Sequence, residues 1–169
     1  MKKNLIILLV ALAFFAGMNI GGYFYQLSTA SYVMNSTYNS VSTEGLVPVE
    51  PQINSSTVYL VGDCKIVSFD VTPDQAYSIL KGMEKSIGAR PLTHDIMKDV
   101  FDVFNINVLQ IRIDRYDSDI YYATIILRQN NKVLELDARP SDAIALAVRL
   151  RMKLYFKQSI LEANGVNVC

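Results

Sequence analysis

The spacing of the apolar residues changes repeatedly along this chain, and these changes limit the folds that it can adopt. Residues 57–71 are rich in β-branched and aromatic side chains, which is typical of strands, and strand-like alternation covers 107–138, whereas helical spacing covers 72–104 and 140–151. A short apolar run over 153–157 reads as a last strand. Because strands and helices come in clusters, the order predicts an α+β domain with a mixed or antiparallel sheet and three helices.

The first two helices of this prediction have recognisable ends. Thr72 is the expected N-cap of the first helix, Pro73 stands in its first turn and Gly88 marks its end. Thr93 is the expected cap of the second helix. The residues expected to face the core are Ala76, Ile79, Leu80, Met83 and Ile87 in the first helix and Ile96, Met97, Val100, Val103 and Phe104 in the second.

The N-terminal region is a long uncharged stretch, Leu5 to Tyr25, that follows Lys2 and Lys3. As a helix it would span about 30 Å, which is one hydrocarbon thickness of a bilayer. We therefore expect residues 1–27 to form a transmembrane signal anchor. A cleaved signal peptide is the alternative, because residues 28–30 resemble a cleavage site with small side chains.

The positions of the basic residues predict the orientation. After the two N-terminal lysines the next basic residue is Lys65, so the N-terminus is expected in the cytoplasm and the rest outside it. Cleavage would instead give a secreted protein. Residues 28–56 are rich in Ser, Thr, Asn, Val and Pro with few charges, which predicts an extended flexible linker before a domain over 57–169.

Charge gives little support to a broad nucleic-acid-binding surface. The chain has 16 basic and 16 acidic residues, and its net charge is zero. A nucleic-acid-binding protein commonly shows a basic stripe. The local basic cluster of Arg149, Arg151, Lys153 and Lys157 is interpreted as a solvated helix end, because cations favour a helix C-terminus.

Cysteine and histidine are scarce in this sequence. Cys64, Cys169 and the single histidine, His94, are too few for a structural zinc site. The two cysteines could form a disulfide in an oxidising compartment, joining the C-terminus to an early strand. Two separate free thiols are the alternative, and the sequence leaves both open.

Two polar segments of similar composition stand out, Arg90–Asp95 and Asp137–Asp142. Each places Arg-Pro at a helix start and an aspartate in the first turn, where the helix dipole favours negative charge. Thr93 and Ser141 offer hydroxyls to the free amides of those turns. Each arginine could pair with the aspartate of the other segment, so a purely structural role is sufficient to explain both segments.

The same residues also suit phosphodiester hydrolysis. Asp95, Asp137 and Asp142 offer hard oxygen ligands for Mg²⁺ or Mn²⁺ and are, with His94, the candidate catalytic residues. Histidine can transfer a proton near neutral pH. The candidate phosphate-binding residues are Arg90, Arg139 and Ser141.

A family resemblance supports the hydrolytic interpretation. The segments "RPLTHD" and "LDARPSDAIALAVR" resemble the signature of the bifunctional nuclease (BFN) domain family, and the likeness covers about 57–167. The resemblance implies a compact α+β domain that self-associates, and nuclease activity on DNA and RNA. Nucleic acid, the membrane and a second copy of the chain are therefore the expected partners.

The chain departs from the family pattern at two places. Thr72 stands where the family has a glycine, and Gln75 where it has a glutamate; a glutamine cannot act as a general base. Arg151 and Met152 replace a frequent Gly-Ala pair. The sequence therefore leaves three hypotheses: a membrane-tethered metal-dependent nuclease, a non-catalytic binding or assembly module, and a sensor of anionic ligands.

Overall fold

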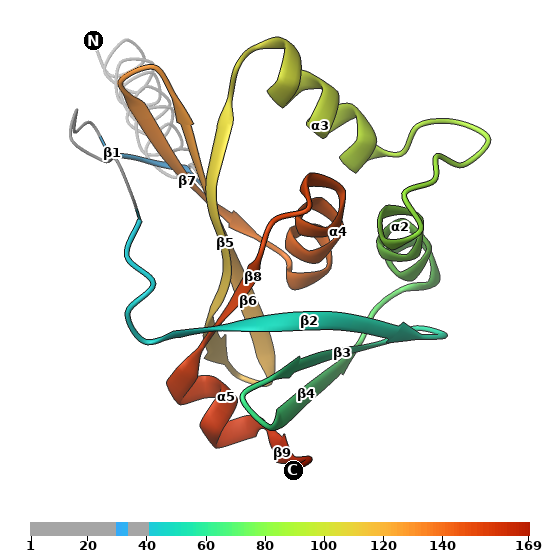
Figure 1. The fold of residues 1–169 in the computed structure, drawn as a ribbon, viewed down its shortest axis with the longest axis vertical. Helices are drawn as coiled ribbons and strands as arrows, with labels where there is room; N and C mark the ends of the chain where they lie inside the picture. Colours follow the sequence, from blue (N-terminus) through green and yellow to red (C-terminus); the bar gives the residue numbers. More distant parts are fainter. Residues whose placement is uncertain (1–29, 34–40) are drawn as a thin grey trace, which may run out of the picture.

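A mixed β-sheet of nine strands organises the protein in a computed structural model, which describes residues 30–33 and 41–169 (Figure 1). The strands are β1 (Ala30–Val33), β2 (Leu46–Asn54), β3 (Thr57–Gly62), β4 (Lys65–Asp70), β5 (Asn107–Asp117), β6 (Ile120–Gln129), β7 (Lys132–Ala138), β8 (Leu154–Lys157) and β9 (Val166–Asn167). Their order is β1-β7-β6-β5-β8-β2-β3-β4-β9, and only β5 and β8 are parallel neighbours.

Four helices accompany the sheet in the described residues: α2 (Pro73–Met83), α3 (Thr93–Val103), α4 (Pro140–Leu150) and α5 (Gln158–Asn164). The predicted α+β class and mixed sheet are confirmed. The predicted number of three helices is wrong, because the C-terminal segment after β8 forms a further helix, α5. Leu161, which is 1% exposed, fixes α5 to the core.

The predicted transmembrane anchor over 1–27 lies outside the described residues. Within the ranges that the structure covers, no helix is both long enough and apolar enough to span a bilayer. The proposed linker, 28–56, lies partly outside them as well.

Strand β2 falls inside the predicted linker and is nevertheless part of the sheet. Its first half, Leu46–Val49, pairs with β8, and its second half, from Glu50, pairs with β3. Pro48 and Pro51 argue against a central strand in the sequence, because proline cannot donate to the ladder. Each half has only one paired side, so each proline nitrogen can point to the other side.

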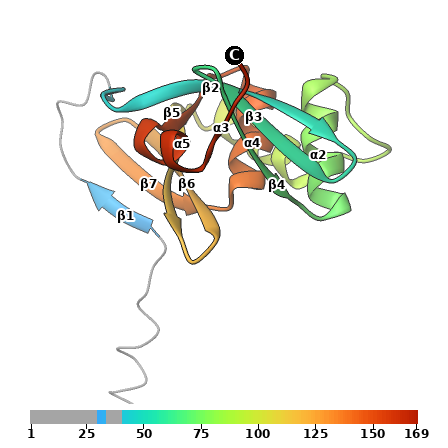
Figure 2. The same cartoon turned by 90° about the horizontal axis from the view of Figure 1, so that it is seen from below.

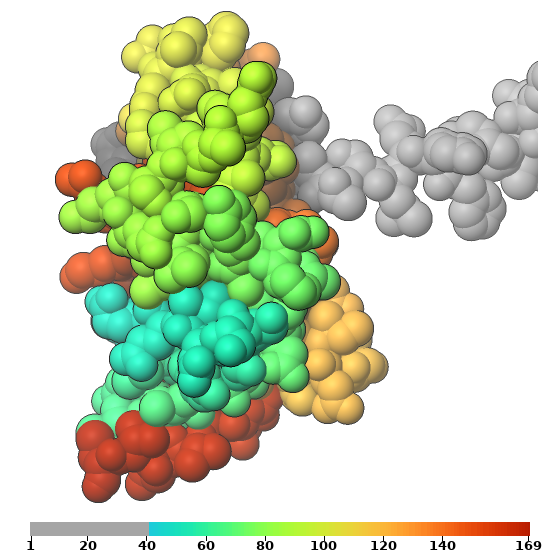
Figure 3. All heavy atoms as spheres, turned by 90° about the vertical axis from the view of Figure 1, so that its right-hand side faces the viewer, coloured from blue at the N-terminus to red at the C-terminus, as the bar shows by residue number. Residues whose placement is uncertain are grey.

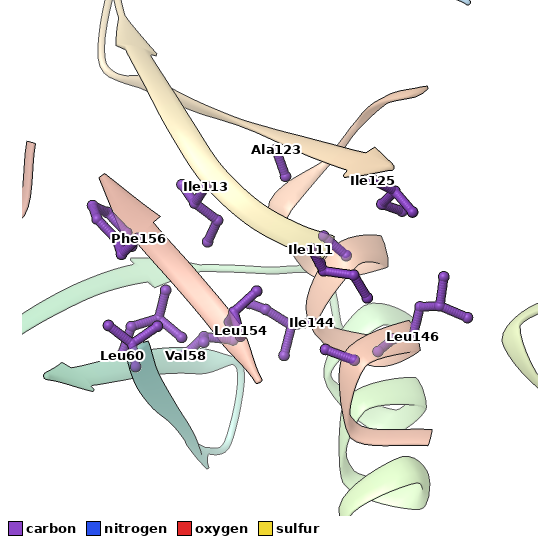
Figure 4. Packing of buried hydrophobic residues seen from close by; sticks show 14 of the residues in the cluster. Val58, Leu60, Ile111, Ile113, Ala123, Ile125, Ile144, Leu146, Leu154 and Phe156 are labelled. Carbon is purple, nitrogen blue, oxygen red and sulfur yellow. The ribbon is translucent and has the colours of Figure 1, made fainter. Parts of the chain in front are cut away.

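The core lies where the sheet bends around α4. In Figure 1, β2, β3 and β4 run across the direction of β5 and β8, with α4 and α2 in the angle between them. Figure 4 shows side chains from β3, β5, β6, β8 and α4 meeting there. Those that are fully buried include Val58, Leu60, Ile111, Ile113, Ala123, Ile144, Leu146 and Phe156. Burying one such aliphatic or aromatic side chain contributes about 1.5–3 kcal/mol.

Helix α3 buries a different face from the one that the sequence predicts. Phe101 is its buried residue, at 7% exposure, and Met97 one turn earlier packs against the core. Four of the five residues expected to be buried are instead exposed: Ile96 (54%), Val100 (40%), Val103 (72%) and Phe104 (60%). The helix is apolar on two sides, and of its apolar residues only Met97 and Phe101 pack in the core.

Helix α2 is shorter than predicted and ends at Met83, not at Gly88. Lys85 has a φ of 55°, a left-handed conformation that stops the helix. Leu80, Met83 and Ile87 are 40%, 38% and 65% exposed, so only Ala76 and Ile79 of the predicted face are buried.

A disulfide between Cys64 and Cys169 joins β4's turn to the C-terminus, so the first of the two cysteine alternatives is confirmed. Strand β9 pairs with β4 beside this disulfide. The disulfide links residues 105 positions apart. A crosslink of that length stabilises a fold by up to about 4.7 kcal/mol in the chain-entropy account.

The first strand, β1, ends the sheet on its other side. In Figures 1 and 2, β1 lies at the outer edge of the sheet, on the opposite side of the molecule from α2.

Candidate functional site

The first turns of α3 and α4 face a common open pocket of about 460 Å³. We call it the His94 pocket. His94 and Thr93 enter it from α3, and Arg139 and Asp142 from the start of α4. Met97, Ile125 and Leu136 form its apolar wall. The two polar segments, more than forty residues apart in sequence, therefore do meet in one accessible place.

His94 is held between a serine and a carboxylate. Its Nδ1 lies 2.9 Å from Oγ of Ser78 on α2, and its Nε2 lies 3.4 Å from Oδ1 of Asp142. The imidazole side chain is 13% exposed. Burial lowers the pKa of His94 below 6.5, and the nearby Asp142 carboxylate offsets only part of this effect. The ring is therefore neutral at pH 7 and can accept a proton.

Arg139 forms a fork with the aspartate of its own helix. Its Nε and Nη2 donate to the two oxygens of Asp142 at 2.7 and 3.1 Å. The expected pairing of Arg139 with Asp95 of the other segment is wrong. Arg139 pairs with Asp142 instead, because Asp142 lies only three positions away at the same helix start. Arg139 is 69% exposed, so its guanidinium remains available to an anion from solvent.

Asp95 points away from this pocket and is occupied by internal partners. Its Oδ1 accepts from Nε of Arg149 at 2.6 Å, and its Oδ2 accepts from the backbone N–H of Leu92 at 2.8 Å. Burial raises the pKa of the Asp95 carboxyl, but these two hydrogen bonds, together with the charge of Arg149, outweigh it and the net pKa is lowered. Asp95 is thus a structural carboxylate of α3, and Arg149, only 4% exposed, is not the solvated helix end that we expected.

The remaining predicted site residues are not gathered around His94. Arg90 is exposed and does not line the His94 pocket. It does not line the pocket between α2, α3 and α4 that contains Arg149 either. Ser141 is 5% exposed and faces a different depression, beside Tyr121. Asp137 borders the pocket, but it pairs with Thr124, one position from the Ile125–Leu136 pair that faces the core. Alternation directs its carboxylate to the opposite face of the sheet.

The predicted metal-binding trio therefore does not form. Asp95 is shielded by Arg149, and only Asp142 of the three presents its carboxylate beside His94. Over residues 30–33 and 41–169, no three His, Cys, Asp or Glu side chains are arranged to hold a metal ion.

The helix starts are built differently from the sequence prediction. Thr72 does cap α2, in a reciprocal box in which the Gln75 side chain accepts from the Thr72 backbone N–H at 2.9 Å. Gln75 therefore has a structural task and does not line the His94 pocket. Thr93 and Ser141 make no such cap: the N-cap residues of α3 and α4 are Leu92 and Arg139, and neither of these two side chains makes a cap bond.

Sequence reasoning missed two residues, Ser78 and Arg149. Ser78 connects two features, because its hydroxyl meets His94 and its carbonyl accepts from Nη1 of Arg149 at 2.9 Å. Arg149 lies seven residues after Asp142, a spacing that places both on one helix face. That spacing does not indicate its partner Asp95, and nothing in the sequence distinguished Ser78 from other helix serines.

Comparison with known proteins identifies the same family that the two polar segments, Arg90–Asp95 and Asp137–Asp142, resemble. The family model described as the bifunctional nuclease domain matches residues 61–168, which is more than half of the chain and includes both segments. The chain therefore belongs to the bifunctional nuclease domain family.

Several curated relatives share about half of the chain. An uncharacterized protein of Mycobacterium tuberculosis is 34% identical over 77 residues, which are 46% of this chain and 45% of that protein. Bifunctional nuclease 1 of Arabidopsis thaliana is 28% identical over 83 residues, 47% of this chain and 26% of its own length. Bifunctional nuclease 2 of Oryza sativa subsp. japonica is 28% identical over 81 residues, 46% and 25% respectively. The chain thus spans under half the length of these relatives.

Proposed function

We propose that this protein hydrolyses phosphodiester bonds of DNA and RNA in the His94 pocket. The observation that carries the proposal is the imidazole of His94, held by Ser78 and Asp142 in an open pocket whose rim carries the exposed Arg139. The names of the plant relatives, bifunctional nucleases, point to the same reaction class.

The chemistry follows from the state of each side chain. In the tautomer whose Nδ1–H donates a hydrogen bond to Oγ of Ser78, the free Nε2 of His94 accepts a proton from water, and the resulting imidazolium faces the Asp142 carboxylate. The hydroxide oxygen bonds to phosphorus as the P–O bond to the leaving oxygen breaks. His94 then returns the proton to that oxygen. Arg139 binds the non-bridging oxygens and stabilises their charge in the transition state.

A divalent cation stays a separate prediction. The predicted ligands do not form a cage, so no step is assigned to a metal ion. Mg²⁺ is commonly held by one or two carboxylates together with substrate phosphates, and Asp142 is the carboxylate placed for that role. Assay in EDTA, followed by addition of Mg²⁺ or Mn²⁺, measures the requirement directly.

The test of the proposal is cleavage of end-labelled single- and double-stranded DNA and RNA by the full-length protein. His94→Ala should lower the rate about 10²–10⁴-fold, the usual contribution of a positioned acid–base group. His94→Ala as active as the parent would remove the proposed role. Absence of any turnover by the parent would leave a binding module, with the helix starts as structural clamps.

Location outside the cytoplasm, tethered to a membrane by residues 1–27, is also a proposal. The Cys64–Cys169 disulfide supports it, because such bonds persist in oxidising compartments. Mapping of the single pass by labelling of intact cells tests it: the domain should be reachable only from outside, and recovery in the medium would indicate cleavage.

Self-association is proposed on the exposed side of α3. Val103 and Phe104, at 72% and 60% exposure, are the most exposed apolar residues there. The measurement is the molar mass in solution of the parent and of a Val103→Asp, Phe104→Ser variant. A monomeric parent would rule the proposal out.

A further inference from the structure

A second pocket lies beside Asp95, the residue that follows His94 at the start of α3. It has a volume of about 260 Å³ and lies between α2, α3 and α4, where Lys81, Lys85, Lys98, Arg149 and Arg151 contribute to its wall. We call it the Arg149 pocket. We propose that it binds a phosphate group; resting on the function proposed above, we assign this group to a backbone phosphate of the nucleic acid, next to the one cleaved at His94.

The first observation is an unused donor on a buried arginine. Arg149 donates from Nε to Asp95 and from Nη1 to the carbonyls of Ser78 and Ala145, at 2.9 Å each. Its Nη2 is the one buried side-chain nitrogen or oxygen in the described part of the chain that has no hydrogen-bond partner. A buried donor without a partner costs about 1–3 kcal/mol, more when charged, so a phosphate oxygen that reaches Nη2 from the pocket would remove this cost.

The second observation concerns the two cations at the rim. Lys85 and Arg151 follow the ends of α2 and α4, both at left-handed φ values of 55° and 54°. Glycine fits such positions without strain, and a long side chain there has to be stabilised by another contribution. Neither residue takes part in an ion pair within the described ranges. The helix dipole alone can account for cations near a helix C-terminus, such as Lys85 and Arg151. It does not account for the buried Nη2 of Arg149, which has no hydrogen-bond partner.

The wall of the pocket is shaped for the arginine. Gly82 of α2 lies so close to α4 that a Cβ there would be 2.5 Å from Cγ2 of Val148 and 2.9 Å from Nη1 of Arg149. Absence of a side chain at Gly82 therefore lets the guanidinium lie between the helices. Figure 3 looks onto this side of the molecule, where α2 and α3 form the outer surface.

Charge and position select a phosphate as the ligand. The lining includes five basic side chains and the acidic Asp95 and Asp99. Arg149, Lys81 and Lys98 are paired with Asp95, Glu84 and Asp102, so Lys85 and Arg151 are the cations of this lining that take part in no ion pair within the described ranges. His94 and Asp95 are consecutive, so the two pockets open on neighbouring sides of one helical turn. A nucleic-acid chain that presents a phosphate to His94 can place the next one against Arg149 and the rim cations.

The test uses full-length protein and follows the Nε–H resonance of Arg149 by ¹H–¹⁵N NMR. Inorganic phosphate should shift this resonance in a saturable way, whereas chloride at equal ionic strength should not. The double variant Lys85→Gln, Arg151→Gln should weaken the binding about tenfold. The matched control Lys132→Gln, Lys157→Gln removes the same charge from exposed positions outside the pocket and should leave it unchanged.

A short oligonucleotide added to the His94→Ala variant separates the sources of the phosphate. If it competes with inorganic phosphate for the Arg149 resonance, the backbone assignment holds; if only inorganic phosphate binds, that assignment is wrong and the phosphate site stands. An Arg149 resonance that phosphate shifts no more than chloride does would overturn the site itself. Cleavage activity is not part of this readout, so failure of the proposed function would not be confused with failure of the site.

Discussion

The two helix starts look alike in sequence and differ in the structure. At the start of α3, Asp95 is 13% exposed and bound by the buried Arg149, while Arg90 is exposed. At the start of α4, Asp142 is 29% exposed, bound by the exposed Arg139, and 3.4 Å from His94. The first start fixes three helices together, and the second presents its charges to an open pocket.

The difference shows that a motif does not decide the role of its residues. Both aspartates satisfy the helix dipole in the same way. What separates them is the cation that binds each one: Asp95 is bound by Arg149 from the last turn of α4, and Asp142 by Arg139 from the same helix start. A buried pair contributes to the fold, whereas an exposed pair can exchange its partner for a ligand.

The largest expected effect concerns the buried pair. Arg149→Met should lower the free energy of unfolding by about 3–5 kcal/mol, because it leaves the shielded Asp95 carboxylate without its partner. Urea denaturation measures this change. The control Arg90→Met removes an exposed arginine of the same segment and should change stability by less than about 0.5 kcal/mol. Equal losses in the two variants would contradict the comparison.

A smaller effect is expected in the pH dependence of stability. Because the pKa of His94 is lowered in the folded protein, the unfolded chain binds more protons between the folded pKa and 6.5. The free energy of unfolding should therefore fall as the pH drops below about 6.5 and stop falling, for this group, below the folded pKa. Asp142, Asp95 and Arg149 are the charged groups that act on this histidine.

Thermal unfolding between pH 5 and 7.5 checks this expectation against His94→Gln. The variant should lose stability less steeply over that interval, since its amide does not titrate. Asp95, whose pKa is also lowered, contributes only at more acidic pH, because its ordinary value is 3.8. Parallel curves for parent and variant would show that His94 is not the titrating group.

The smallest effect on stability is expected at the exposed pair. Arg139→Ala should change the free energy of unfolding by less than about 1 kcal/mol, as is usual for solvent-exposed ion pairs. Its kcat/KM for nucleic acid should fall about tenfold or more, the scale of one charged hydrogen bond. Calorimetry together with the cleavage assay measures both. A large stability loss with unchanged kcat/KM would assign Arg139 to the fold instead.

Much of the fold followed from periodicity, and the failures have physical causes. Enrichment in β-branched and aromatic residues identified β3 and β4, and alternation identified β5 to β7, where one face of the sheet is buried. Strand β2 was missed because its two prolines hide a strand that changes its neighbour halfway along. The face of α3 was wrong because both sides of the helix are apolar, and only tertiary contact selects Met97 and Phe101.

The sequence predicted which residues lie at the candidate site, but it did not predict which of their side chains pair with each other. His94, Arg139 and Asp142 were named and do meet, because the helix starts that carry them converge. Asp95 was assigned to the wrong environment, since its partner Arg149 lies 54 residues away and on another helix. Contacts of that sequence separation depend on how α2, α3 and α4 pack, which local patterns do not specify.

The most direct test of the central claim compares Asp142→Asn with Asp95→Asn in the full-length protein, measuring cleavage rate per folded molecule and free energy of unfolding for each. Asp142→Asn should lose rate and keep its stability, and Asp95→Asn should lose stability and keep its rate. If both variants lose the same property, the two helix starts do not have the separate roles that their partners indicate.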